Sequence, residues 1–299
     1  MQRSGDDPEG VRDRGRRVGG WRVADDVLGG DRPVVMGVLN VTPDSFSDGG
    51  LALGEDGSPD VAVARGLALV AAGADIVDVG GESTRPGAAP VSGAREIDRT
   101  EQVVAGLAAA GVRVSIDTTK ASVAAAAIDA GAVIVNDVSA GRFDPDLLPL
   151  VADRGVAYVL MHMVGTPRTM QDEPAYDDVV AEVAEFLATT RDRLVDDGIA
   201  DDRIAIDPGI GFGKSMRHNL DLLRATTTLA AIAPVVIGVS RKSFLGTITG
   251  MDDPADRDPA SAAVAALVVA AGALIVRAHD VVATRQAVDV ARVLAGDGD

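Results

Sequence analysis

The stretch GVRVSIDTTKASVAAAAIDAGAVIVND, residues 111–137, contains one full repeat of the unit that decides the fold. Gly111 and Gly131 each end a helical stretch rich in Ala and Val, and glycine is favoured at that position because it adopts left-handed backbone angles. After each glycine comes a short apolar run, 112–117 and 132–137, typical of a strand buried on both faces. The stretch therefore predicts parallel strands joined by a helix.

The unit recurs along the chain. Further runs follow Gly73, Gly155, Gly198 and Gly272, and two more lie at 34–38 and 235–239. Eight strands alternating with helices between residues 33 and 295 predict a (β/α)8 barrel in a single domain, which is an α/β fold. A doubly wound open sheet is the alternative. It would more often show a glycine-rich dinucleotide turn after the first strand, where this chain has the sequence NVTP at 40–43.

Composition sets the limits of the domain. The chain has 299 residues, of which 47% are hydrophobic, enough for one barrel-sized core. Residues 1–18 are charged and glycine-rich and predict a disordered tail, 19–32 a small hairpin, and 19–299 the barrel domain with its core at 33–295. No apolar stretch is long enough to span a membrane and no signal sequence opens the chain, so we expect a cytoplasmic protein without a membrane partner.

Net charge and residue types exclude several functions. A charge of −17 disfavours nucleic acid as a partner, and an anionic substrate needs a locally positive pocket. The chain has no Cys, and its three His lack metal-ligand spacing, so thiolate and zinc-thiolate chemistry are excluded. The acid excess and the scarcity of Lys would suit a high-salt cytoplasm. A GC-rich genome that favours Arg, Ala, Val and Asp is the alternative explanation.

Polar residues follow every predicted strand. In (β/α)8 barrels the chemistry lies at the carboxyl ends of the strands. The groups found there, in chain order, are Asn40; the 82–87 segment; Asp117; Asn136 and Asp137; Met161 and His162; Asp207; Ser240, Arg241 and Lys242; Arg277 and His279. A single Asp or Asn in such a place usually caps a helix. Their convergence on one barrel mouth favours a ligand, because buried polar groups without partners are costly.

Four of these groups match one kind of ring. A carboxylate accepts two parallel N–H groups, an amide both donates and accepts, and an ammonium donates to a carbonyl or ring nitrogen. Asp207, Asn136, Asp117 and Lys242 could therefore surround a guanine-like or pterin-like heterocycle.

The last strand predicts an anion site. Arg277 and His279 lie on one face because side chains alternate along a strand. With Arg85 and Ser240 they fit the phosphate site that barrels often form after strands 7 and 8. A structural ion pair is the alternative role of Arg277.

The segment GIGFGKS, 209–215, looks like a phosphate-binding loop but lacks the spacing of one. Pro208 stands where the first glycine of a P-loop is needed, and Lys214 where a dinucleotide motif has its third glycine. We interpret the segment as a loop that brings backbone close to a flat ring, with Phe212 available for stacking.

Taken together, the motifs MGVLNVTPDSFSDGG, DVGGESTRPG, IDT, NDVS, DPGIGFGK, GVSRKSFLG and RAHDV closely resemble those of the dihydropteroate synthase family, in family order, over about 33–295. The resemblance implies a (β/α)8 barrel and a homodimer. It implies a transferase that joins 6-hydroxymethyl-7,8-dihydropterin diphosphate to 4-aminobenzoate with Mg²⁺, giving dihydropteroate and pyrophosphate for folate biosynthesis.

The resemblance also assigns residues. Those expected at the pterin are Asp117, Asn136, Met161, Asp207, Phe212, Gly238 and Lys242. Asn40 is expected to contact Mg²⁺ and, with Thr84, Arg277 and His279, the diphosphate. Those expected around aminobenzoate are Phe46, Ser83, Thr84, Arg85, Pro86 and Ser243. Phe46 lies in a lid-like first loop, 40–50, and Ser83 to Pro86 lie in a mobile second loop.

The expected mechanism is dissociative loss of diphosphate. Arg277, His279 and Arg85, together with Mg²⁺, stabilise the leaving group, and Asp117 stabilises the cationic pterin methylene. Lys242 completes the catalytic set. The aryl amine then attacks without a strong base, which agrees with a sequence that offers no evident Ser–His pair or general base. Two alternatives stay open: a pterin-dependent corrinoid methyltransferase, which would not need the SRK motif, and a pterin-binding paralogue without catalysis.

Overall fold

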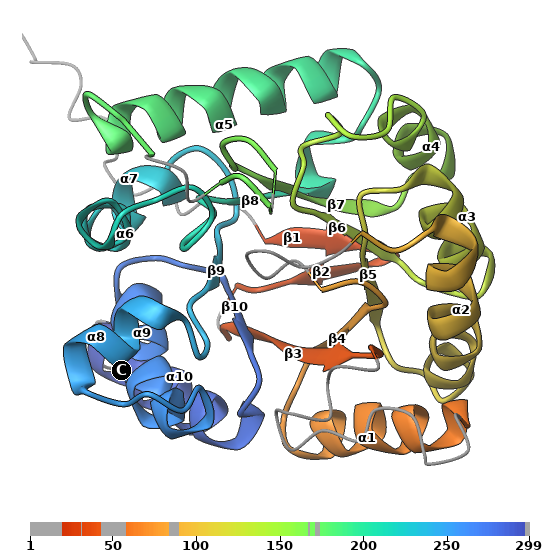
Figure 1. The fold of residues 1–299 in the computed structure, drawn as a ribbon, viewed down its shortest axis with the longest axis horizontal. Coiled ribbons are helices and arrows are strands. Elements are labelled where there is room, and N and C mark those ends of the chain that lie inside the picture. The colour runs from red at the N-terminus through yellow and green to blue at the C-terminus, as the bar shows by residue number, and fades with distance from the viewer. Residues whose placement is uncertain are drawn as a thin grey trace, which may run out of the picture.

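The structure, a computed structural model, describes residues 20–30, 32–42, 58–83, 90–166, 168–170 and 174–296. Within these residues eight parallel strands form one sheet with helices around it, in the order β8-β7-β6-β5-β4-β3-β10-β9 (Figure 1). The strands are β3 (Val34–Asn40), β4 (Ile76–Gly80), β5 (Val114–Asp117), β6 (Ile134–Asp137), β7 (Ala157–Met161), β8 (Ile204–Asp207), β9 (Val236–Gly238) and β10 (Ile275–Ala278). A parallel bridge between Ile206 and Val235 joins the two ends of the sheet. The predicted (β/α)8 barrel is confirmed, and the open-sheet alternative is wrong.

Helices alternate with the strands and cover the outside of the barrel. They are α1 (Pro59–Ala71), α2 (Gly93–Ala109), α3 (Ala121–Asp129), α4 (Leu147–Arg154), α5 (Val179–Asp196), α6 (Met216–Arg224), α7 (Thr226–Ala230), α8 (Ser243–Thr249), α9 (Asp258–Ala270) and α10 (Val281–Ala295), with short 3-10 turns η2 (Asp201–Arg203) and η3 (Ala255–Arg257). The six glycines predicted to end helices all have positive φ, as the left-handed cap requires.

An antiparallel hairpin, β1 (Trp21–Val23) and β2 (Asp26–Leu28), precedes the barrel, as predicted. Trp21 and Val23 are fully buried in one cluster with inward-facing strand residues such as Met36 and Ile134. The Trp21 indole N–H donates to the carbonyl of Arg203 at 2.9 Å. The hairpin thus packs against the apolar inside of the barrel. The predicted tail at 1–18 lies outside the described residues.

Strand alternation divides the barrel interior into an apolar and a polar part. Val35, Val77 and Ile116 face the helices in the larger core cluster, whereas Met36 and Ile76 belong to the inner one. On five of the strands the inward side chain nearest the carboxyl end is polar: Asp78, Asp117, Asn136, Asp207 and Arg277. The polar layer therefore lies at the carboxyl ends of the strands. No helix among the described residues is long and apolar enough to cross a membrane.

Candidate functional site

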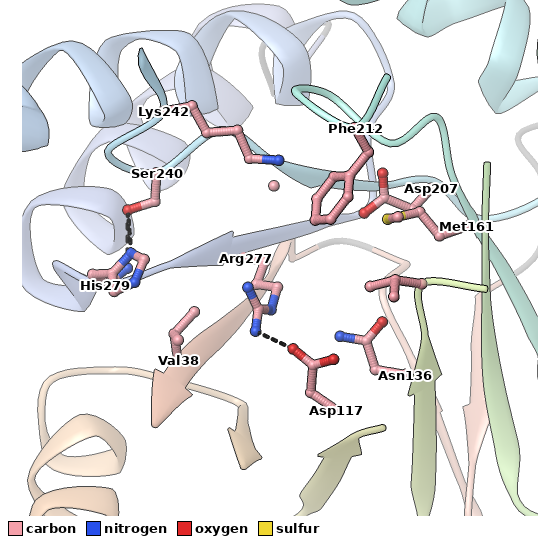
Figure 2. A pocket seen from close by; sticks show the side chains of 12 residues that line it. Val38, Asp117, Asn136, Met161, Asp207, Phe212, Ser240, Lys242, Arg277 and His279 are labelled. Carbon is pink, nitrogen blue, oxygen red and sulfur yellow. Dashed lines mark hydrogen bonds and ion pairs between the residues drawn. The ribbon is translucent and has the colours of Figure 1, made fainter. Parts of the chain in front are cut away.

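A pocket opens at the carboxyl end of the barrel, enclosing about 440 Å³ with open solvent at its mouth included (Figure 2). It is lined by Val38, Asp117, Asn136, Val138, Met161, Asp207, Phe212, Gly238, Ser240, Lys242, Arg277 and His279. All seven residues expected at the ring are in this set, and so are the Arg and His expected at the anion. Residues from distant parts of the sequence are thus brought together by strand register.

Register explains the grouping. Asp117 pairs with Asn136 on the neighbouring strand, Met161 with Asp207, and Arg277 with Gly238. The members of each pair therefore lie side by side on the inner face, where Gly238 contributes no side chain. A Cβ added to Gly238 would come no nearer than 3.9 Å to the Arg277 side chain, so its missing side chain leaves room in the pocket.

Arg277 lies between two carboxylates. Its Nε donates to Asp78 Oδ2 at 2.7 Å and its Nη2 to Asp117 Oδ2 at 2.8 Å. These two carboxylates raise the pKa of Arg277 further, although burial acts in the opposite direction. The structural ion pair weighed as an alternative is therefore present. It uses two of the five N–H groups of a guanidinium that still lines the pocket, so an anion role is also compatible.

Asp78 is a site residue that the sequence analysis missed. It is fully buried on β4, and its Oδ2 accepts from Asn136 Nδ2 at 3.1 Å as well as from Arg277. A carboxylate only accepts, so Asn136 must turn its NH2 toward Asp78 and its carbonyl oxygen the other way. Asp78 lies inside its strand rather than at the end, and the rule of searching strand ends passed over it.

Burial governs the charge of Asp117. It raises the pKa of this carboxyl to about 7, against the lowering effect of Arg277 and with a further rise from the charge of Asp78. Asp117 is therefore a carboxyl whose protonation changes close to neutral pH. A cationic group developing beside it would favour its ionised form.

On the opposite wall, Asp207 faces Lys242. Burial raises the pKa of Asp207, while the Lys242 ammonium lowers it. Burial lowers the pKa of Lys242 to about 8, with Asp207 acting to raise it. Lys242 Nζ also donates to the carbonyl of Ile210 and lies 4.5 Å from the centre of the Phe212 ring. This wall offers one acceptor, one cationic donor and one aromatic face.

The loop between β8 and α6 owes its course to glycine. Gly209, Gly211 and Gly213 all have positive φ, in the left-handed region that residues with side chains rarely adopt. A Cβ at Gly209 would collide with the backbone carbonyl of His162, and one at Gly211 would lie 3.0 Å from Cδ of Lys242. This close packing places Phe212 against the pocket.

Ser240 and His279 form a hydrogen-bonded pair. The Ser240 hydroxyl lies 2.9 Å from His279 Nδ1 and accepts the His279 backbone N–H at 3.1 Å (Figure 2). The expectation that no Ser–His pair lies at the barrel mouth was wrong. The two residues are 39 positions apart and follow the neighbouring strands β9 and β10, so their spacing along the chain gave no sign of contact.

The turn after β9 is held from outside the pocket. Arg241 has φ of 62°, unusual for a residue with a side chain, and its guanidinium donates twice to Asp258 at 2.8 Å. Its backbone N–H donates to Ser261 at 3.0 Å. Arg241 thus points to α9, while its neighbours Ser240 and Lys242 line the pocket.

The remaining predicted residues lie at the edge or outside. Phe46, Thr84, Arg85 and Pro86 are outside the described residues. Ser83 is half-buried at the end of the described segment after β4, and Ser243 is exposed as the first residue of α8. Neither of these two serines is among the pocket-lining residues.

An ion-pair cluster lies where the chain leaves β4. Lys120 Nζ donates to Glu96 Oε2 at 2.7 Å and also to Glu82, with Glu96 fully buried. These groups lie outside the lining of the pocket.

Asn40 is suited to Mg²⁺ only together with a substrate. Its half-buried amide ends β3 next to Gly80, where a Cβ would lie 3.6 Å from both Asn40 Oδ1 and Asp117 Cβ. No group of three His, Cys, Asp or Glu able to hold a metal occurs among the described residues. Mg²⁺ commonly takes one or two protein oxygens and fills its octahedron with water and phosphate oxygens, so a single amide oxygen fits.

The fold is a (β/α)8 barrel, and carboxyl, amide, ammonium and guanidinium groups line one pocket at the carboxyl ends of its strands. Residues 36–279 match the family model described as pterin binding enzyme. The chain therefore belongs to the pterin-binding enzyme family.

Several similar proteins are dihydropteroate synthases. The dihydropteroate synthase of Mycobacterium leprae is 50% identical over 267 residues, 87% of this chain and 92% of that protein. The Xanthomonas albilineans dihydropteroate synthase solved with 4-aminobenzoic acid is 44% identical, with a TM-score of 0.84 over 93% of this chain and 98% of that one. The same enzyme in complex with 7,8-dihydropteroate is 43% identical, with a TM-score of 0.78 over 88% and 94%.

Proposed function

We propose that this protein is a dihydropteroate synthase, a transferase of folate synthesis that joins 6-hydroxymethyl-7,8-dihydropterin diphosphate to 4-aminobenzoate. One observation carries the proposal. A carboxylate, an amide and an ammonium, from Asp207, Asn136 and Lys242, converge on a single pocket beside Arg277 and His279. The relatives solved with 4-aminobenzoic acid and with 7,8-dihydropteroate support this substrate and this product.

Ring recognition follows from donors and acceptors. Asp207 would accept the amino and ring N–H groups of the amino-pyrimidinone with its two oxygens. The Gly209 N–H, which donates to Oδ1 at 2.7 Å, holds this carboxylate in place. The Asn136 carbonyl oxygen, which Asp78 turns away from itself, would accept a further N–H, and Lys242 would donate to the ring. Phe212 and Met161 would cover its faces.

The anion side would hold the diphosphate. Arg277 and His279 would donate to its oxygens, and Asn40 would help to hold a Mg²⁺ ion on this side of the pocket. When bound, the ion would supply positive charge that stabilises the leaving diphosphate. Because the whole protein carries −17, this local positive charge is what would attract an anionic substrate.

Charge development gives each residue a role in the step. The C–O bond between the pterin methylene and the diphosphate breaks, and positive charge spreads from the methylene into the ring. Asp117 in its ionised form would stabilise that charge, and Arg277 and His279 the departing oxygens. The aminobenzoate nitrogen would then bond to the methylene carbon and release one proton to the departing diphosphate. The Ser240–His279 pair would orient the imidazole toward the leaving group.

We also propose a homodimer formed through α9 and α10, which lie next to each other in the structure (Figure 1). Their outer faces carry exposed apolar side chains: Leu267, Val282, Val290, Val293 and Leu294. Exposed apolar side chains gathered on two neighbouring helices are typical of a protein interface. Light scattering should give twice the chain mass of 30.5 kDa, and Leu267→Glu with Val290→Glu should give a monomer. A monomeric wild type would contradict the dimer.

Pyrophosphate release tests the function. Purified protein with the dihydropterin diphosphate and Mg²⁺ should release pyrophosphate and form dihydropteroate only when 4-aminobenzoate is present. Pterin binding without turnover would instead favour the non-catalytic paralogue, and methyl transfer from a methylated pterin the corrinoid methyltransferase. Running the assay from low to multimolar KCl also tests the high-salt hypothesis, which best activity at low salt would contradict. A cytoplasmic location remains a prediction.

A further inference from the structure

Lys214 is a buried cation outside the lining of the pocket. Only 3% of it is exposed, and its ammonium lies 3.0 Å from His162 Nδ1, 3.0 Å from the Phe212 carbonyl and 3.4 Å from the His162 carbonyl. An ammonium has three N–H groups, so these acceptors match its donors in number. Burial lowers the pKa of His162 to about 3, so its ring is neutral and Nδ1 can accept.

The three acceptors belong to two segments. His162 directly follows β7, and Phe212 lies in the glycine-rich loop after β8. Backbone hydrogen bonding also joins the segments, since the His162 N–H donates to the Asp207 carbonyl at 3.0 Å. The Lys214 ammonium therefore fixes the Phe212 backbone, whose ring faces the pocket, to the end of the strand that carries Met161 (Figure 2).

Charged groups around Lys214 also affect the pKa values of Lys214 and Asp207. The groups that act on Lys214 are Asp207 from β8 and Lys242 from the turn after β9, with neutral His162 in contact from the end of β7. Burial lowers the pKa of Lys214 to about 7, and Asp207 acts to raise it. Conversely Lys214, together with Lys242 and Arg277, lowers the pKa of Asp207 and so favours its ionised form.

We propose that Lys214 is a positioning residue for the pterin: its ammonium, bonded to His162 at the end of β7 and to the Phe212 carbonyl, holds Phe212 in stacking position. The inference rests on the pterin site proposed above. It acts through other groups, because Lys214 itself does not line the pocket. Loss of the ammonium would leave three buried acceptors without donors, and the loop would move to reach water.

Lys214→Met tests the proposal, because it keeps an unbranched chain of similar length without donors or charge. Lys120→Met is the control, since it removes a partly buried lysine that bonds two acidic groups away from the pocket. The measurements are the Kd of dihydropterin diphosphate by calorimetry, the KM for both substrates, and the melting temperature. Lys214→Gln, which retains two N–H donors without charge, is the second variant in case the first does not fold.

We expect Lys214→Met to raise the pterin Kd about tenfold or more, the size of one lost charge-assisted hydrogen bond, while the KM for aminobenzoate rises by less than about twofold. Lys120→Met should lower the melting temperature without changing the pterin Kd. Lys214→Gln should bind pterin more weakly than the wild type. A folded Lys214 variant with wild-type pterin affinity, or equal weakening in the Lys120 control, would overturn the inference. Absence of pterin binding by the wild type would overturn the proposed function instead.

Discussion

Asp78→Ala should weaken pterin binding even though Asp78 does not line the pocket. The carboxylate accepts two hydrogen bonds, 2.7 Å from Arg277 Nε and 3.1 Å from Asn136 Nδ2. Alanine removes both acceptors. Arg277 keeps its bond to Asp117, but the Asn136 amide is then free to present either its oxygen or its NH2 to the ring.

The size of the effect follows from these contacts. Removing one partner of a buried ion pair costs about 3–5 kcal/mol, and the retained bond of Arg277 to Asp117 favours the lower end, about 3 kcal/mol of unfolding free energy. Loss of a defined amide orientation should raise the pterin Kd about tenfold, or about 1.4 kcal/mol. Asp78→Asn keeps an acceptor and loses the charge, so its effects on stability and Kd should be smaller.

The pH dependence of kcat/KM provides an independent test of the role of Asp78. The charge of Asp78 raises the pKa of Asp117, so Asp78→Asn should lower that pKa from about 7. Asp117 then stays ionised to lower pH, and the acid limb of kcat/KM moves to lower pH. Denaturant unfolding, calorimetry with dihydropterin diphosphate and a pH–rate profile measure these quantities. Wild-type pterin affinity in a folded Asp78→Ala protein, or an acid limb that moves to higher pH, would refute the reasoning.

Three further predictions concern titration, backbone and core. Steady-state kcat/KM should fall below pH 7 as Asp117 gains a proton and above about pH 8 as Lys242 loses its charge, and a flat profile across this range would contradict both roles. Gly209→Ala should abolish measurable pterin binding, because its Cβ would collide with a backbone carbonyl. Gly111→Ala, also at positive φ but in open space, should lower the unfolding free energy by only about 1–3 kcal/mol and leave the pterin Kd unchanged. Equal losses of pterin binding in the two variants would argue against the loop packing. Trp21→Ala should lower the unfolding free energy by about 3–5 kcal/mol in denaturant titrations, and a loss below about 1 kcal/mol would show that the hairpin does not close the core.

The fold could be predicted because its signals are local. A glycine after each helix and an apolar run after the glycine define the unit, and repetition of the unit defines the barrel. Strand limits were less well defined. Asn40 lies inside β3 rather than beyond it, and β9 spans only Val236–Gly238 of the run 235–239, because the turn with Arg241 at positive φ begins directly after it.

The site was predictable where it follows strand ends and not where it depends on pairing between strands. Asp117 and Asp207 end their strands and Asn136 is the last residue but one of its strand, so position alone indicated them. Asp78 contacts Arg277 across 199 residues and Ser240 contacts His279 across 39, and such contacts appear only when register is known. Lys214 was noted only as a mismatch to a motif. Its three acceptors come from the folded loop, and no spacing along the chain indicates them.

Calorimetric titration of dihydropterin diphosphate into the wild type and Asp207→Asn tests the pterin site most directly. The substitution keeps the shape of the side chain but replaces one acceptor oxygen by a donor, which faces the N–H groups of the ring. Tight binding by the wild type with a Kd about 10 to 100 times higher for Asp207→Asn is the expected result, the size of losing a bond to a charged group. Equal affinity of the two proteins would contradict a ring held by this carboxylate, and with it the account of the pocket.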